Sequence, residues 1–147
     1  MEYSLNVLII DDEEVVRETI KAAMDFLGHK AILAETGQQG IDLFSKHKDM
    51  IDVVLLDSNM PGVDGLSVLN EIKKIKDCVD VVLMSGFVDD DIVKMYNEAG
   101  VKKILPKPFD LTSLSNIITE IHQEKLVSLK EQQRVSFSPE NKSTEII

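Results

Sequence analysis

The sequence lacks several features that mark common classes of protein. It has no tryptophan and a single cysteine, Cys78, so an internal disulfide is impossible and a reducing compartment is expected. It has no apolar run long enough to cross a bilayer, and no basic segment precedes the short apolar run near Met1. These absences predict a cytoplasmic protein with no secretory signal and no membrane partner.

Positive charge is also scarce. Sixteen Lys and Arg residues stand against 26 Asp and Glu residues, which gives a formal net charge of −10 at pH 7. Direct binding of nucleic acid needs clustered Lys and Arg, so nucleic acid is not expected as a partner. From Leu126 onward three basic and three acidic residues cancel, so the whole surplus lies in residues 1–125.

What the sequence does contain is a rhythm of short apolar runs separated by segments with helical spacing. The runs at 53–56 and 81–84 are apolar without alternation, which is typical of parallel strands buried on both faces. We predict an α/β fold: a doubly wound five-stranded parallel sheet in the flavodoxin-like order 2-1-3-4-5, with helices on both faces. The predicted strands span residues 5–10, 30–35, 52–57, 80–85 and 101–106.

The rhythm stops after about Gln123, which divides the chain into a domain over residues 1–124 and a C-terminal tail over 125–147. Asp110 is well placed to cap the last helix, and strong helix formers predict that this helix continues to about Arg134, before a disordered segment. The extension would leave apolar side chains exposed. They would pack on a partner or on a second copy in a homodimer, unless the tail is frayed. These side chains are Leu126, Val127 and Leu129.

Polar residues stand where the predicted strands end. In an open parallel sheet these ends share one edge, and strands one and three are neighbours where the strand order reverses. Three carboxylates should therefore converge on one crevice, with a hydroxyl and an ammonium group beside them. The residues are Asp11 and Asp12 after the first strand, Asp57 at the third, Ser85 at the fourth and Lys107 after the fifth.

Each of these residue types has a chemical role at such an edge. Three close carboxylates repel one another, and Mg²⁺ relieves that repulsion while keeping room for a phosphoryl oxygen. An ionised Asp57 is a nucleophile toward phosphorus, and Lys107 and Ser85 can stabilise phosphoryl oxygens. Taken singly, the same residues are typical of helix caps, turns and surface lysines. Their shared position at strand ends is what favours the chemical interpretation.

The sequence resembles the receiver domain of bacterial response regulators. The matching motifs are VLIIDDEE, VVLLDSNMPGVDG, VVLMSG and LPKPF, in that order, across about residues 5–120. The resemblance implies that a sensor histidine kinase or a histidine phosphotransfer protein donates a phosphoryl group to Asp57. It implies a phosphorylation-activated switch that signals by protein–protein contacts to an unknown target. Enzymatic activity would be limited to self-phosphotransfer and slow autodephosphorylation.

The resemblance also implies roles for the other site residues. Mg²⁺ would be held by Asp11, Asp12, Asp57 and the backbone carbonyl of Asn59. Ser85 would be the switch hydroxyl, Lys107 would bind the phosphoryl group, and the Lys107–Pro108 peptide would be cis.

Two positions depart from the family pattern. Ile104 stands where the family usually has Tyr or Phe, and Ser85 replaces the common threonine. We expect the chemistry to survive both changes. The readout through the fourth helix and fifth strand should then depend on Ser85 and the loop that follows it.

Two other functions are compatible with parts of the pattern. The chain could be the receiver fragment of a larger DNA-binding or enzymatic response regulator. It could also be an aspartyl-phosphate phosphatase, but those enzymes place the nucleophile after the first strand in a DxD pattern, and here that strand is followed by DDEE.

The histidines and methionines are predicted to play ordinary roles. The three histidines should be scattered among different elements without forming a metal site, and four methionines should fill gaps in the core. The residues concerned are His29, His47 and His122, and Met24, Met50, Met84 and Met95.

Overall fold

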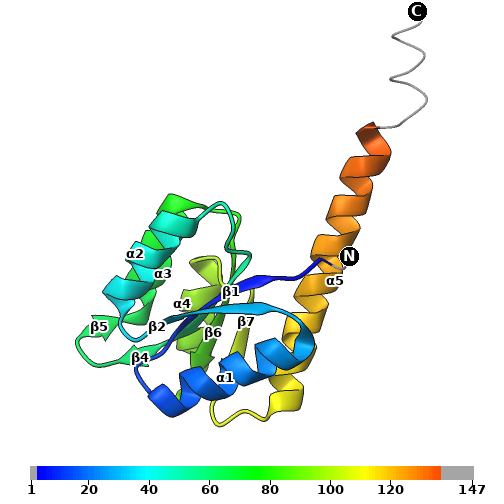
Figure 1. Cartoon of the computed structure of the whole chain (residues 1–147). Coiled ribbons are helices and arrows are strands. Elements are labelled where there is room, and N and C mark those ends of the chain that lie inside the picture. The colour runs from blue at the N-terminus through cyan, green and yellow to red at the C-terminus, as the bar shows by residue number, and fades with distance from the viewer. Residues whose placement is uncertain (1–2, 137–147) are drawn as a thin grey trace, which may run out of the picture.

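A five-stranded parallel sheet lies between two layers of helices in the computed structural model, which describes residues 3–136 (Figure 1). The strand order is β2-β1-β3-β6-β7. This is the predicted flavodoxin-like order, because β4 and β5 form a separate small hairpin. The sheet strands are β1 (Asn6–Ile10), β2 (Lys30–Ala34), β3 (Val53–Asp57), β6 (Asp80–Ser85) and β7 (Lys103–Pro106).

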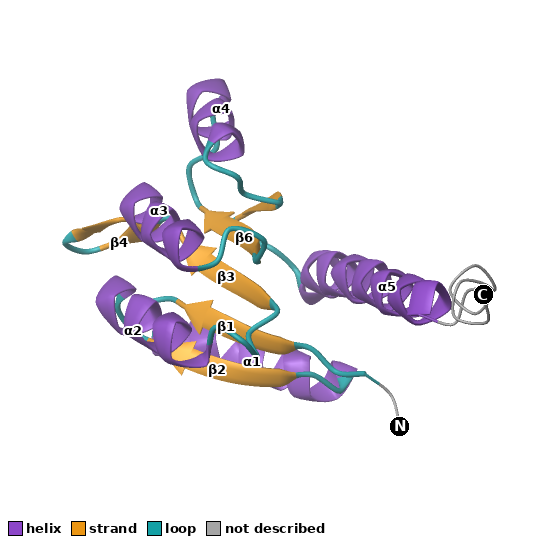
Figure 2. Cartoon of the chain, turned by 90° about the horizontal axis from the view of Figure 1, so that it is seen from above, coloured by secondary structure: helices purple, strands orange, loops and turns teal. Residues whose placement is uncertain are grey.

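The helices divide between the two faces of the sheet, as Figure 2 shows from above. One face is covered by α1 (Glu14–Leu27) and α5 (Leu111–Ser136). The other is covered by α2 (Gly37–His47), α3 (Gly65–Ile75) and α4 (Asp90–Glu98). The predicted α/β architecture with helices on both faces is confirmed.

The central strand shows why its sequence is apolar without alternation. Val53 and Leu55 pack in the cluster beneath α1 and α5, whereas Val54 and Leu56 pack in the cluster beneath the other three helices. All four side chains are fully buried. Successive strand residues point to opposite faces, so a strand covered on both sides needs an apolar residue at every position.

Local capping fixes where several helices begin and end. Gly28 ends α1 in the left-handed region with φ 86°, a conformation that glycine adopts without strain. The Asp89 carboxylate accepts a 2.8 Å hydrogen bond from the Ile92 N–H at the start of α4. Asp110 accepts a 2.7 Å bond from the Ser113 N–H at the start of α5, as predicted.

Helix α5 continues well past the edge of the sheet, as Figure 1 shows. Its first turns bury Leu114, Ile118 and Ile121 completely, whereas farther along Val127 is 53% and Leu129 39% exposed. The predicted domain boundary at residue 124 and the predicted homodimer stay predictions. The predicted disordered segment lies outside the described residues.

Two details differ from the sequence-based expectation. A short antiparallel hairpin, β4 (Asn59–Met60) and β5 (Val63–Asp64), follows the third sheet strand, where no strand was predicted. Met50 and Met95 are 48% and 39% exposed, so their assignment to the core is wrong; Met24 and Met84 are fully buried. Met50 lies in a turn and Met95 on an exposed part of α4, positions that apolar composition alone does not reveal.

Within residues 3–136, no helix combines the length and the apolar composition that a bilayer span requires.

Candidate functional site

Three aspartates converge at the carboxyl edge of the sheet, the edge at which the parallel strands end. Asp11 and Asp12 follow β1, and Asp57 is the last residue of β3, which pairs in parallel with β1. One carboxylate oxygen from each aspartate lies within 4.8 Å of those of the other two. Asp11 is fully buried and Asp57 is 2% exposed, whereas Asp12 faces solvent. The predicted convergence of these three side chains is present.

Asp11 is held in place by its own neighbourhood. Its Oδ1 accepts a 2.9 Å hydrogen bond from the Glu13 N–H, which fixes the side chain against the start of α1. Its backbone carbonyl accepts a 2.8 Å bond from the guanidinium group of Arg17. Arg17 was not singled out from the sequence, because a single arginine on a helix carries no signal of what it will contact.

Lys107 reaches across the same edge from the segment after β7. Its Nζ lies 3.0 Å from Asp11 Oδ2 and 3.3 Å from Asp57 Oδ1. Burial acts to lower the pKa of Lys107, but its hydrogen bond to Asp11 and the charges of Asp11 and Asp57 raise it, and the net direction is upward. The amino group is therefore cationic at neutral pH. The Lys107–Pro108 peptide is cis, as the resemblance implied.

Negative charge is in excess at this edge. Burial raises the pKa of Asp57, and the nearby Asp11 charge adds to this, while the Asn59 N–H and Lys107 act in the opposite direction; the net pKa is raised. Lys107 supplies one positive charge to two of the three carboxylates, Asp11 and Asp57, and burial makes ionised Asp57 less favourable here than in water. The donor set fits a hard divalent cation such as Mg²⁺, which prefers carboxylate oxygens and would relieve this excess.

The Ser85 hydroxyl lies at the same edge but is bonded within its own loop. Ser85 ends β6 and is 2% exposed. Its Oγ donates a 2.9 Å hydrogen bond to the Phe87 carbonyl and accepts a longer one, 3.3 Å, from the Phe87 N–H. In this arrangement Ser85 stabilises the β6–α4 loop, and its hydroxyl would have to turn to reach a group on Asp57.

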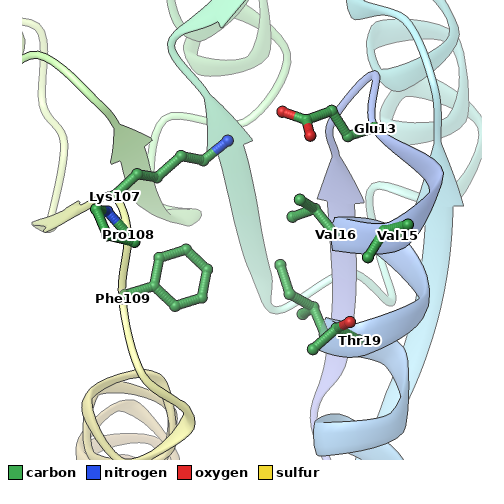
Figure 3. A pocket seen from close by; sticks show the side chains of 8 residues that line it. Glu13, Val15, Val16, Thr19, Lys107, Pro108 and Phe109 are labelled. Atoms are coloured by element: carbon green, nitrogen blue, oxygen red, sulfur yellow. The ribbon is translucent and has the colours of Figure 1, made fainter.

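A groove opens beside Lys107, between α1 and the segment that leads into α5. It has a volume of about 390 Å³. Figure 3 shows Phe109 on one wall, Val16 and Thr19 on the opposite wall, and the Lys107 amino group and the Glu13 carboxylate at one end. The groove is thus mostly apolar along its length and charged at the end that lies next to the aspartates.

The opposite edge of the sheet holds a second polar cluster, which we call the amino-edge cluster: Tyr3, His29, Asp52 and His122. The rings of His29 and His122 pack edge to face with centroids 4.9 Å apart, and Tyr3 stacks on His122. The histidines belong to different elements, as expected, but His29 and His122 lie in contact, which was not predicted. They lie 93 residues apart in the sequence, and only the docking of α5 brings them together.

Comparison with known proteins agrees with this geometry. Residues 7–119 match the family described as the response regulator receiver domain. The chain is 29% identical over 112 residues to sporulation initiation phosphotransferase F of Bacillus subtilis, covering 76% of this chain and 89% of that protein. It is 31% identical over 112 residues to response regulator MprA of Mycolicibacterium vanbaalenii, covering 75% of this chain but only 47% of that protein.

Solved structures share the fold. A response regulator receiver domain protein from Clostridium thermocellum superposes with a TM-score of 0.77 at 30% identity, covering 84% of this chain and 98% of that one. The family match spans most of the chain, and the sheet order and helix layers agree with it. The chain belongs to the response regulator receiver domain family.

Proposed function

We propose that this receiver domain takes a phosphoryl group onto Asp57 from a phosphohistidine of a partner protein. The observation that carries the proposal is the position of Lys107, whose amino group contacts both Asp11 and Asp57 within a cluster of three carboxylates. This arrangement combines a buried nucleophile, a cation for phosphoryl oxygens and a set of metal ligands in one crevice.

The transfer itself needs little from the protein beyond position and charge. An ionised oxygen of Asp57 attacks phosphorus and forms a P–O bond. The P–N bond to the imidazole of the partner breaks, and the electron pair stays on the ring nitrogen. Lys107 then holds a phosphoryl oxygen, and the Ser85 hydroxyl turns from the Phe87 carbonyl to donate to another.

Asp11, Asp12 and Asp57 are proposed to hold Mg²⁺ together with the backbone carbonyl of Asn59. When bound, Mg²⁺ supplies positive charge that balances the carboxylates and the phosphoryl oxygens. The Asn59 N–H donates a 3.1 Å hydrogen bond to Asp57 Oδ1, so Asn59 already lies against the phosphoacceptor.

The partner is proposed to be a sensor histidine kinase or a histidine phosphotransfer protein. Receiver domains interact with both classes, and the groove beside Lys107 offers a mostly apolar surface next to Asp57. Val15 on its α1 wall is 77% exposed. An amphipathic helix that carries the phosphohistidine could lie in this groove with its apolar face inward.

We infer that the domain works as a switch without steady turnover. A phosphatase nucleophile after the first strand would be Asp11, but this carboxylate is fully buried and bonded to the Glu13 N–H and to Lys107.

The chain spans about half the length of MprA, so a receiver that forms part of a larger protein stays a second option. The downstream target, the cytoplasmic location and the absence of nucleic-acid and membrane partners stay predictions.

Incubation with Mg²⁺ and acetyl phosphate tests the proposal. Intact-mass measurement should show one added phosphoryl group in the wild type and none in Asp57→Asn. Equal labelling of the two proteins would overturn the assignment of Asp57. Continuous release of phosphate far beyond one equivalent would favour the phosphatase instead.

A further inference from the structure

The packing of helix α4 against the rest of the domain centres on one side chain. Within α4, Tyr96 is the single buried side chain, and it is 4% exposed. Ile92 and Val93 are half-buried, whereas Met95 is 39% exposed. The position of α4 therefore depends on what surrounds the Tyr96 ring and its hydroxyl group.

The Tyr96 hydroxyl lies beside the residue that follows the phosphoacceptor. A methyl group added at Gly65 would come within 2.8 Å of the Tyr96 hydroxyl oxygen and 2.9 Å of Ser58 Cα. Gly65, the first residue of α3, thus leaves room for a hydroxyl that comes from α4 and packs near Ser58. The Ser58 N–H is fixed by a 2.9 Å bond to the Met84 carbonyl, so this segment also joins β3 to β6.

The Tyr96 hydroxyl is also coupled electrostatically to Asp57. Burial raises the pKa of Tyr96, the charges of Asp64 and Asp57 raise it further, and the Leu66 N–H acts in the opposite direction. Added negative charge on Asp57 is therefore felt at the phenol as well as through the Ser58 backbone.

Space for movement adjoins this contact. A cavity of about 460 Å³ lies next to Tyr96, and its lining includes Ser58, Ser85 and Phe87. Phe87 itself is 73% exposed and is held through the two hydrogen bonds of its backbone to Ser85. The residues around Asp57 and those of α4 thus face one cavity, so a shift on one side need not be blocked by close packing on the other.

We propose that Tyr96 is the positioning residue that couples the phosphoacceptor edge to helix α4. Its hydroxyl lies at the start of α3, beside Gly65 and near Ser58, so a change at Asp57 moves the ring and, with it, the helix. Ile104, on β7, is half-buried and has no polar atom in its side chain, so it cannot make this contact. The inference rests on the proposed phosphorylation of Asp57.

The chain has two tyrosines, and Tyr3 serves as an internal control for Tyr96. Tyr3 lies at the opposite edge of the sheet, where its hydroxyl donates a 2.9 Å bond to Asp52. We would label the full chain with tyrosine carrying ¹³C at the ring carbon that bears the hydroxyl, and assign the two NMR signals with Tyr3→Phe. Spectra are recorded with Mg²⁺ before and after acetyl phosphate, with intact mass measured on the same sample.

The expected result is a shift of the Tyr96 signal that grows in proportion to the phosphorylated fraction, while the Tyr3 signal stays within its linewidth. The Asp57→Asn protein should show neither change. A phosphorylated sample in which the Tyr96 signal does not move would overturn the inference and leave the proposed function intact. A protein that takes up no phosphoryl group would overturn both.

A variant then distinguishes coupling of Asp57 to α4 through Tyr96 from a mere effect of the phosphoryl charge on a nearby ring. Tyr96→Phe keeps the ring and removes the hydroxyl, and it should at least halve the phosphorylation-dependent amide shifts of α4 at equal phosphorylation. Tyr3→Phe should leave those shifts at full size. Full-sized α4 shifts in Tyr96→Phe would overturn the inference and assign the coupling to the Ser85 loop alone. The labelling experiment needs no substitution of Tyr96. It therefore tests the inference even when Tyr96→Phe folds poorly.

Discussion

The two edges of the sheet both bury polar groups, but they do so in opposite ways. At the amino edge the Asp52 carboxylate accepts hydrogen bonds from the Tyr3 hydroxyl at 2.9 Å and the Asn6 N–H at 2.8 Å. There, His29 Nδ1 accepts a 3.0 Å bond from the Leu5 N–H, and His122 Nε2 lies 2.7 Å from the Tyr3 carbonyl. The one carboxylate is matched by two donors, both from the N-terminal segment that leads into β1.

At the carboxyl edge the balance is different. Asp11 and Asp57 share one cation, Lys107, and the Asp12 carboxylate adds a third negative charge beside them. Yet among the described residues no buried side-chain nitrogen or oxygen lacks a hydrogen-bond partner, so the difference is one of charge and not of unmet hydrogen bonds. The comparison indicates that the amino edge contributes to stability, whereas the carboxyl edge keeps an excess of negative charge that fits a divalent cation.

The largest effect should come from removing the lysine of the carboxyl edge. Lys107→Ala leaves the fully buried Asp11 carboxylate without its cation, which should cost about 3 kcal/mol of the free energy of unfolding. Phosphorylation by acetyl phosphate should slow by about 10²-fold, the usual cost of losing one donor to a developing charge. Urea denaturation and intact mass measure the two effects.

Lys125→Ala is the matched control. Lys125 pairs with Asp80 at 3.5 Å in a more exposed setting, so its loss should cost about 0–1 kcal/mol and leave phosphorylation unchanged. If the two lysine variants lost equal stability, the special role of the Lys107 pair would be wrong.

The next effect concerns the amino edge. Asp52→Ala removes the acceptor of two hydrogen bonds, and since bonds to charged groups are the stronger ones, it should cost about 2 kcal/mol. Phosphorylation of Asp57 should proceed at the wild-type rate. A fall in the phosphorylation rate at temperatures where the variant is folded would show that the two edges are not independent.

Removing an aspartate charge should have the opposite effect on stability at the carboxyl edge. Asp57→Asn should raise the stability of the metal-free protein at pH 7 by about 1 kcal/mol, because it removes a buried charge from an excess of like charge. The raised pKa means that the folded state holds its proton to higher pH than the unfolded state. Wild-type stability from this group is therefore greatest below the unfolded pKa and is lost as pH rises through the folded pKa.

The advantage of Asp57→Asn should accordingly shrink as the pH is lowered toward 4. Melting curves from pH 4 to 8 without metal measure it, and Asp52→Asn is the control at the other edge. An Asp57→Asn protein that is less stable than the wild type at pH 7 would contradict the excess of negative charge.

The smallest effect should be a pH dependence at the amino edge. Burial lowers the pKa of His29, the neighbouring His122 lowers it further, and Asp52 partly opposes this. A lowered folded pKa means that stability is fully present above the unfolded pKa of about 6.5 and is lost as pH falls through the folded pKa. His29→Asn keeps an acceptor for the Leu5 N–H and does not titrate, so it should lose less stability between pH 7 and 5.

The expected difference is the smallest of these effects, because it comes from a single ionisation whose shift Asp52 partly opposes. Parallel urea titrations at pH 7 and pH 5 would measure it. Identical losses of stability in the wild type and His29→Asn would show that His29 does not cause the pH dependence.

The carboxyl edge was largely predictable from the sequence, and the amino edge was not. Asp11, Asp57 and Ser85 stand at the ends of apolar runs, and the topology of a parallel sheet brings such ends together. By contrast, His29 and His122 belong to segments whose contact depends on how α5 packs across the sheet. No short-range pattern encodes such a contact.

Tyr96 shows a second limit of sequence reasoning. A tyrosine within a helix has the spacing of a core residue, and nothing in the local pattern reveals how far its hydroxyl reaches. The contact arises because Gly65 leaves a space at the start of α3 and Ser58 lies at its border. The hairpin of β4 and β5 was missed for a similar reason, because strands of two residues carry no periodic signal.

The effect of Mg²⁺ on thermal stability tests the central claim most directly, that the carboxyl edge is built around an excess of carboxylate charge. At ten times its Kd, Mg²⁺ should stabilise the wild type by about 1.4 kcal/mol, which corresponds to roughly 3–6 °C in Tm for a domain of this size. Asp12→Asn should lose most of this increment, and Asp52→Asn, at the amino edge, should keep it. An unchanged increment in Asp12→Asn, or an equal loss in both variants, would contradict the claim.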